Sequence, residues 1–184
     1  MKTIGNAPNI SAYAGSVNQL RTGSISEDRY IRGKAFSFED YFIFASGEVK
    51  LFVFDPALYL GPLLDFNPII LASTSGPVLL DFYYNFLGAA DGTLLMASNR
   101  RAGFAGPLGT FRLNPTPTVE GEFGTRFAGD LVPATGLNPN KSAGSANEKS
   151  LRFEPSRTLK TAFTLTNLDG ANNYLQMKLT WFET

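Results

Sequence analysis

Apolar and polar residues alternate one by one along the end of the chain, from Lys160 to Thr184. A period of two places neighbouring side chains on opposite faces of a β-strand, so the pattern predicts two strands that each have an apolar face. The apolar positions are Phe163, Leu165, Leu175, Met177, Leu179 and Trp181. Between them, Asn167 to Asn173 carries the Asn, Asp and Gly residues typical of a turn. We therefore expect a tight hairpin that ends the chain inside its own sheet.

Short apolar runs separated by Gly, Pro, Asn and Ser recur along the rest of the chain. They predict strands over residues 30–38, 41–45, 48–55, 69–73, 78–86, 93–97 and 150–154. Short strands at spacings of roughly 8–12 residues are typical of sandwiches and jelly rolls, and no stretch has a convincing helical period. We expect an all-β fold, an antiparallel β-sandwich that is jelly-roll-like, because long glycine-rich crossings favour that wiring over a simple meander.

The predicted strand 48–55 is apolar on both of its faces. Phe52 and Phe54 alternate with Leu51 and Val53. A strand of this kind is covered on both sides, and we expect the opposite sheet on one side and another chain on the other. The dipeptide Ser46-Gly47 predicts a hairpin with the strand before it.

The first residues of the chain, 1–28, are rich in Ser, Asn, Gly and Thr and keep neither strand nor helix periodicity. Single apolar residues recur among the polar ones, including Ile4, Ile10 and Tyr13. We divide the chain into an extended N-terminal arm, 1–28, and a sandwich domain, 29–184. The arm is either a flexible leader or a segment that orders on another subunit, with these three side chains as contacts.

Charged residues make up 17% of the chain, below the ~25% typical of soluble domains, and 16 basic residues balance 16 acidic ones. The balance provides no basic field for nucleic acid, and the low charged fraction suggests that partners cover part of the surface. The sequence shows no signal-peptide core and no apolar run long enough for a membrane helix. We expect neither nucleic acid nor a membrane as a partner.

The chain contains no Cys and no His. These absences exclude disulfides, thiolate nucleophiles, Cys- or His-ligated metals and every catalytic triad that includes His. The acidic residues are dispersed, and the adjacent pair Glu39-Asp40 is interpreted as a polar turn, with calcium binding or acid–base chemistry as the alternative. We expect no enzyme activity, no catalytic residues, no cofactor and no metal site.

Two loops, 99–118 and 133–149, are rich in Gly, Pro and Asn and are candidate contact segments. Within the first, Gly103 to Gly109 lacks the Lys-Ser/Thr of a phosphate-binding loop. The adjacent Arg100-Arg101 is interpreted as a solvated turn, as an ion pair to a neighbouring subunit or as a grip on an anion. We expect Arg100, Arg101 and Phe104 in a partner contact.

An aromatic run over residues 82–86, Phe-Tyr-Tyr-Asn-Phe, predicts core packing or a subunit interface, with a sugar platform as the alternative. The run has no neighbouring Lys or Arg, so it is poorly suited to nucleic acid. We expect the four aromatic residues of this run, Phe82, Tyr83, Tyr84 and Phe86, to lie at a subunit seam together with Phe52 and Phe54.

The C-terminal part of the sequence has an order of strands and turns that resembles a known group of proteins. Phe-Gly-Thr-Arg-Phe-Ala-Gly-Asp-Leu-Val-Pro, residues 123–133, precedes a loop rich in Gly, Ser and Asn. Leu-Arg-Phe-Glu-Pro-Ser, residues 151–156, then leads to the strand 161–166, the turn Asn-Leu-Asp-Gly and a strand that ends Leu-Thr-Trp-Phe-Glu. Over residues 120–184 this order resembles small jelly-roll virion proteins of tailed bacteriophages, namely capsid decoration (cement) proteins and head-fibre-like proteins, which are usually trimeric.

The resemblance implies a structural role on the capsid surface of a virion, with the major capsid protein and further copies of this chain as partners. We expect a decoration protein that binds across capsomer junctions as a homotrimer. A receptor- or glycan-binding module of a fibre or tail is the alternative, with Tyr83, Tyr84 and Trp181 presented to sugars. A third hypothesis, a glycan hydrolase that depends on Asp and Glu, requires two carboxylates about 5–10 Å apart.

Overall fold

The computed structural model describes residues 10–14, 20–24, 30–56, 64–66, 70–73, 75–134 and 159–183. All the secondary-structure elements with defined bounds among these residues are β-strands, and this confirms the predicted all-β fold. The strands are β1 (Ile10–Ala14), β2 (Leu20–Ser24), β3 (Ala35–Phe44), β4 (Val49–Asp55), β5 (Leu64–Phe66), β6 (Ile70–Ser73), β7 (Val78–Tyr84), β8 (Thr93–Leu95), β9 (Ser98–Asn99), β10 (Thr110–Leu113), β11 (Thr125–Val132), β12 (Thr161–Asn167) and β13 (Asn173–Glu183).

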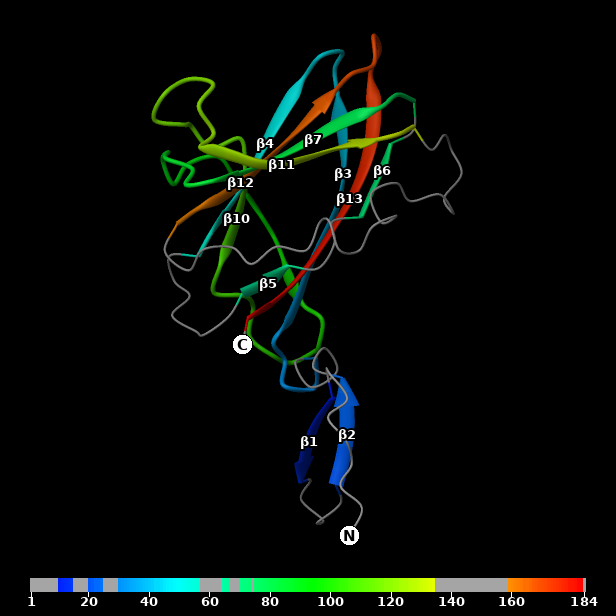
Figure 1. The fold of residues 1–184 in the computed structure, drawn as a ribbon, viewed down its shortest axis with the longest axis vertical. Coiled ribbons are helices and arrows are strands. Elements are labelled where there is room, and N and C mark those ends of the chain that lie inside the picture. The colour runs from blue at the N-terminus through cyan, green and yellow to red at the C-terminus, as the bar shows by residue number, and fades with distance from the viewer. Residues whose placement is uncertain are drawn as a thin grey trace.

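Two antiparallel sheets pack against each other to form the sandwich that the sequence predicted (Figure 1). One sheet has six strands in the order β11-β7-β12-β4-β10-β8, and the other has the order β5-β13-β3-β9, with β6 also paired to β13. The jelly-roll wiring stays a prediction, because the predicted strand at 150–154 lies outside the described residues.

The two predicted hairpins are wrong. The strands lie where the sequence predicted them, but each pair is split between the two sheets and its turn connects one sheet to the other. Strand β3 pairs with β13, whereas β4, which follows it, pairs with β10 and β12 in the opposite sheet. Strands β12 and β13 are likewise split between the sheets. Alternation along a strand does not reveal which sheet the next strand joins, because the same face is apolar in either case.

The strand pairs β3–β4, β12–β13 and β6–β7 lie side by side as three arches, since β13 lies between β3 and β6 while β12 lies between β4 and β7. Buried amide side chains join their turns. Asn167 donates from Nδ2 to the carbonyl oxygens of Ala45 and Ala171, both at 2.9 Å. Asn173 donates to Gly76 O at 2.9 Å and to Asn167 Oδ1 at 3.3 Å. The network therefore fixes the three turns relative to one another.

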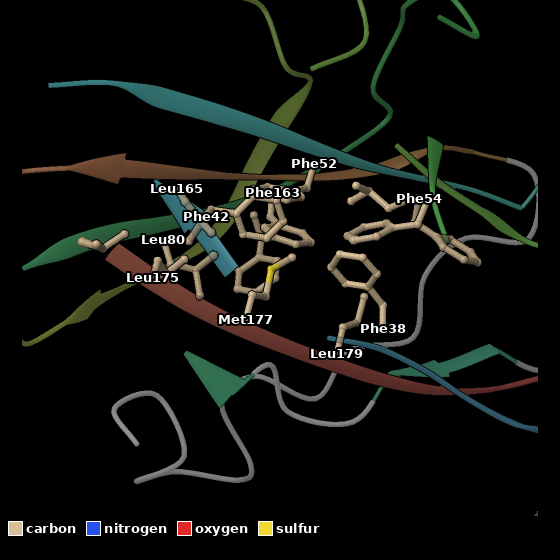
Figure 2. Packing of buried hydrophobic residues seen from close by; sticks show 14 of the residues in the cluster. Phe38, Phe42, Phe52, Phe54, Leu80, Phe163, Leu165, Leu175, Met177 and Leu179 are labelled. Atoms are coloured by element: carbon tan, nitrogen blue, oxygen red, sulfur yellow. The ribbon is translucent and has the colours of Figure 1, made fainter. Parts of the chain in front are cut away.

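The core between the sheets is built largely of aromatic rings (Figure 2). Phe52 is fully buried at its centre, and its ring stacks on that of Phe163 with centroids 5.0 Å apart and planes 10° apart. Phe42 meets the Phe52 ring edge-on, with the centroids 5.2 Å apart, and Phe111 stacks on the Phe52 ring at 5.9 Å. Such ring pairs add roughly 0.5–1.5 kcal/mol each beyond the burial of their area.

A second, smaller core lies on the outer face of the six-stranded sheet. Leu51 and Val53 of β4 pack there with Ala162 of β12 and with Phe86, while Phe123 and Tyr83 pack against them. Both faces of β4 are thus covered, as its sequence predicted, but residues of the same chain supply the second cover. The expected cover by another chain is therefore wrong for Leu51 and Val53.

The structure also changes two details of the N-terminal half. Residues 35–44 form one continuous strand, so the predicted break at Glu39-Asp40 is wrong. The segment assigned to an extended arm contains a hairpin, β1 paired with β2, which Figure 1 shows beyond one end of the sandwich. The division of the chain at residues 28 and 29 stays a prediction.

On two edge strands, an aspartate side chain accepts a hydrogen bond from the backbone N–H of the next residue. Beyond its short pairing with β9, β3 is an edge strand, and the N–H of Tyr41 donates to Oδ1 of Asp40 at 2.8 Å. On the edge strand β11, the N–H of Leu131 donates to Oδ1 of Asp130, also at 2.8 Å. A free N–H group on an edge invites the addition of a foreign strand, so the two aspartates occupy donors that such a strand would need.

Glu48, in the turn between β3 and β4, makes the stability of the fold depend on pH. Its carboxylate pairs with Lys50 and accepts the N–H of Ala45 at 2.7 Å, and these interactions, Lys50 first, lower the pKa of Glu48 below its ordinary 4.5. A carboxyl whose pKa is lowered by folding stabilises the fold above its unfolded pKa, and this contribution is lost as pH falls through the folded pKa. We expect the free energy of unfolding to decrease as pH drops below about 4.5. Urea titrations should show a weaker acid dependence for Glu48→Gln, and an identical dependence would contradict the assignment.

Candidate interaction surfaces

The structure moves several of the predicted interface aromatics into the interior of one chain. Phe52, Phe54, Phe82 and Phe86 are 0%, 3%, 1% and 2% exposed, so they are core residues and cannot form a subunit seam. The prediction is wrong for these four because strand periodicity marks an apolar face without saying what covers it. Trp181 is fully buried as well, so it cannot be presented to a sugar.

The two tyrosines of the aromatic run lie against other rings of the chain. Tyr83 meets Phe123 edge-on with centroids 5.7 Å apart. Tyr84 stacks on Phe127 of β11 at 3.7 Å, with the ring planes 10° apart. Both tyrosines are partly exposed, so their predicted role at a subunit contact stays a prediction.

Two of the three contact residues predicted in the N-terminal segment lie on strand β1. Ile4 lies outside the described residues. Ile10 and Tyr13 belong to β1, where they are opposite Ser24 and Arg21 of β2. Their predicted contacts with a partner stay predictions.

Three predicted contact residues do come together, on what we call the Arg–aromatic surface. Its members are Tyr30, Ile31, Arg100, Arg101, Phe104 and Leu108. The guanidinium carbon of Arg101 lies 4.5 Å from the centroid of the Phe104 ring, and that of Arg100 lies 6.0 Å from the Tyr30 ring. Tyr30 and Phe104 are 43% and 44% exposed. The sequence identified the two arginines and Phe104, but not Tyr30, which precedes Arg100 by 70 positions.

The loop that carries this surface is held by Asn99. The Nδ2 group of Asn99 donates to Gly33 O and to Ala105 O, both at 2.8 Å, and its Oδ1 accepts the N–H of Arg101 at 2.9 Å. Gly33 is itself required here: its φ is +67°, and a Cβ at this position would overlap the Phe104 ring. One amide side chain thus closes the loop onto the turn before β3.

A buried carboxylate anchors the other end of the loop. Glu183 is 3% exposed and accepts the N–H groups of Leu108 at 3.0 Å and Gly109 at 3.1 Å, together with the indole N–H of Trp181 at 3.2 Å. Glu183 is not among the site residues predicted from the sequence. Its signal was present, because Glu183 is a charged residue on the apolar face of the alternation that includes Trp181.

A second exposed surface, the tyrosine face, lies on the outer side of the five-stranded sheet. It consists of Tyr41 and Ile43 of β3 and Tyr174 of β13, which are 72%, 59% and 56% exposed. Tyr174 is directly opposite Ile43 across the two strands, and Tyr41 is opposite Gln176. Beyond them, Glu39 accepts a hydrogen bond from Gln176 at 2.8 Å and lies 3.5 Å from Lys178. An apolar patch with a polar rim is typical of an interaction site.

An ion pair braces the edge of the six-stranded sheet, between β11 and β7. Arg126 Nη2 lies 2.6 Å from Asp81 Oδ1, and the Asp81 side chain is 13% exposed. The arginine crosses Gly129 to reach it, since a Cβ on Gly129 would overlap both the guanidinium and the carboxylate. The absence of a side chain at position 129 therefore permits the pair.

Replacing Gly129 with alanine is expected to lower the free energy of unfolding by about 1.5 kcal/mol, because the largely buried carboxylate of Asp81 loses its partner. Gly106→Ala is the matched control, since a Cβ there meets no atom within 4 Å. We expect the control to change stability by less than about 0.5 kcal/mol. Equal losses for the two variants in denaturant titrations would contradict the role of Gly129.

A metal or ligand site would need clustered acidic side chains or a sizeable pocket. In the part of the chain that the structure describes, no cluster of three or more Asp and Glu side chains is arranged to hold a metal ion. Asp91 accepts hydrogen bonds from the hydroxyl and the N–H of Thr116 at 2.6 and 2.7 Å, and these bonds lower the pKa of Asp91.

A pocket of about 100 Å³ is lined by Asn85, Leu87, Thr118, Val119, Glu122 and Gly124. Its volume is below the roughly 300–1,000 Å³ of ligand pockets.

Comparisons with known proteins add no assignment. No protein-family model matches the chain, and no curated protein matches it. Among the described residues, no helix is both long and apolar enough to cross a membrane.

Proposed function

We propose that the protein is a non-enzymatic structural protein of a tailed-phage virion, which decorates the capsid as a homotrimer bound across capsomer junctions. The major capsid protein is its partner. The proposal is supported by the strand and turn order of residues 120–184, by the sandwich fold and by the low charged fraction of 17%. On this account the protein stabilises the shell by burying surface at each junction.

The observation that carries the proposal is the tyrosine face. Tyr41 at 72%, Ile43 at 59% and Tyr174 at 56% exposure stand together on a sheet whose other face already covers the core. Burying apolar area yields about 25 cal/mol per Å², so a partner that covers these side chains gains binding energy without any change of fold. Tyrosine is also enriched at protein interfaces.

The alternative role, a receptor- or glycan-binding module, retains one specific observation in its favour. Tyr41 and Tyr174 are exposed aromatic rings on the same sheet face, and sugars stack on such rings. Of the residues predicted to contact sugars, Trp181 is buried and not available, whereas Tyr83 and Tyr84 are partly exposed. A glycan array separates the roles, since a decoration protein should bind none of its glycans.

Size-exclusion chromatography with light scattering tests the assembly that the proposal requires. We expect the purified chain to elute with the mass of a trimer, and the double variant Tyr41→Ser, Ile43→Ser to elute with a smaller mass or to lose its binding to undecorated shells. Leu94→Ser is a matched control, because Leu94 is 46% exposed on β8 in the other sheet. A wild-type monomer with no affinity for shells would refute the proposal.

A further inference from the structure

We propose that the Arg–aromatic surface binds an acidic face of a partner protein, with Arg100 and Arg101 as the carboxylate-binding groups. The inference rests on the proposed function only for the identity of that partner, which would be the capsid. The chemistry of the surface follows from its own side chains.

The two guanidinium groups are available to a partner. Among the residues that the structure describes, no carboxylate forms an ion pair with Arg100 or Arg101. Each guanidinium lies on an aromatic ring instead, at 4.5 Å for Arg101 and 6.0 Å for Arg100. A guanidinium that rests on a ring keeps N–H groups at its edge, where a carboxylate can accept two parallel hydrogen bonds. Lys34, which is exposed in the turn before β3, adds positive charge to the same end of the sandwich.

The arginines are presented by a backbone that is already ordered. The N–H of Arg100 donates to Ala35 O at 2.9 Å, and the N–H of Arg101 donates to Asn99 Oδ1 at 2.9 Å. Glu183 holds the end of the loop through Leu108 and Gly109. Binding therefore requires little ordering of the loop, and a site that is ordered in advance binds with a smaller entropic cost.

The apolar members of the surface favour a protein over other polyanions. Leu108 is 51% exposed, Phe104 44% and Ile31 36%, and these side chains belong to the same loop and to the turn that it contacts. They offer apolar contacts that a phosphate or sulfate chain does not make favourably. Proteins that bind nucleic acid through its phosphates typically neutralise about 6–10 of them, many more than two arginines can. Attraction to an anionic membrane amounts to about 1 kcal/mol per basic residue, too little for a pair of arginines to bind alone. Arginine and aromatic side chains together are typical of the centre of a protein interface.

Retention on immobilised poly-L-glutamate at low salt tests the chemistry without a capsid. We expect wild-type protein to be retained and to elute as salt rises, and the variant Arg100→Ala, Arg101→Ala to lose about tenfold in affinity, equivalent to about 1.4 kcal/mol. Lys178→Ala is the matched control, since Lys178 is an exposed cation that already lies 3.5 Å from Glu39. Unchanged unfolding midpoints would show that the variants fold. Failure of the wild type to bind, or tighter binding to heparin or to phosphatidylglycerol vesicles, would overturn the inference.

Pelleting with undecorated shells then separates the two proposals. If the wild type pellets and the double arginine variant pellets at least tenfold more weakly, both hold and the Arg–aromatic surface faces the shell. If both proteins pellet equally, the decoration role stands and the inference for the capsid contact fails. If the wild type binds poly-L-glutamate but no shells, the decoration role fails while the acidic-partner inference stands.

Discussion

Replacing Phe52 with alanine is expected to lower the free energy of unfolding by about 4 kcal/mol, within the range for a buried phenylalanine. Phe52 is fully buried, and its ring contacts those of Phe42, Phe111 and Phe163 from both sheets. Its removal leaves a cavity at the centre of the sandwich, because three large rings cannot close the space without leaving their rotamers. Urea denaturation followed by tryptophan fluorescence measures the loss, with Trp181 as the single, buried reporter.

The variant also separates two roles for Phe52, core residue and seam residue. Tyr41→Ala removes a ring of similar size that is 72% exposed, and we expect it to change the stability of the isolated chain by less than about 0.5 kcal/mol. If Phe52 belonged to a seam, its replacement would weaken association and leave the unfolding of one chain nearly unchanged. A loss below about 1 kcal/mol for Phe52→Ala would contradict its place in the core.

Replacing Asn173 with alanine is expected to cost about 3 kcal/mol, because several buried polar groups lose their partner at once. Oδ1 of Asn173 accepts the hydroxyl of Ser73 at 3.0 Å, and the N–H and hydroxyl of Ser75 at 3.2 and 3.0 Å. Its Nδ2 donates to Gly76 O and to Asn167 Oδ1. Asn173 is fully buried, so water cannot replace these bonds without opening the turns.

Two further variants show whether the amide itself matters. Asn172→Ala changes the neighbouring residue, whose side chain is exposed, and should leave stability within about 0.5 kcal/mol of the wild type. Asn173→Asp keeps the size and the acceptor but removes the two N–H donors and adds a buried charge, so it should be at least as destabilising as alanine. A harmless Asn173→Asp substitution would show that the donors to Gly76 and Asn167 carry no stability.

The positions of the strands could be predicted from the sequence better than their partners. The alternation from Phe163 to Trp181 located β12 and β13 closely, because a half-buried strand leaves a period of two in its own residues. It could not separate a hairpin from an arch. That choice depends on contacts distant in sequence, such as the bonds from Asn173 to Ser73 and Gly76, which join residues about 100 positions apart.

Contacts between residues distant in sequence also explain why the candidate surfaces were predicted only in part. The two apolar faces of β4 predicted two covers, but nothing local to Leu51 and Val53 shows that Phe86 and Phe123 provide the second. For the arginines, the sequence indicated available charge next to a Gly-rich loop. The ring under Arg100 comes from Tyr30, and only the fold brings it there. Glu183 could have been recognised, because a carboxylate on an apolar face needs donors.

The most direct test of the decoration role is electron cryomicroscopy of undecorated shells incubated with the purified protein. The account predicts added density with threefold symmetry across the capsomer junctions, into which the sandwich fits with its exposed tyrosine face or its Arg–aromatic surface buried. Shells that stay bare at saturating protein concentration would contradict it.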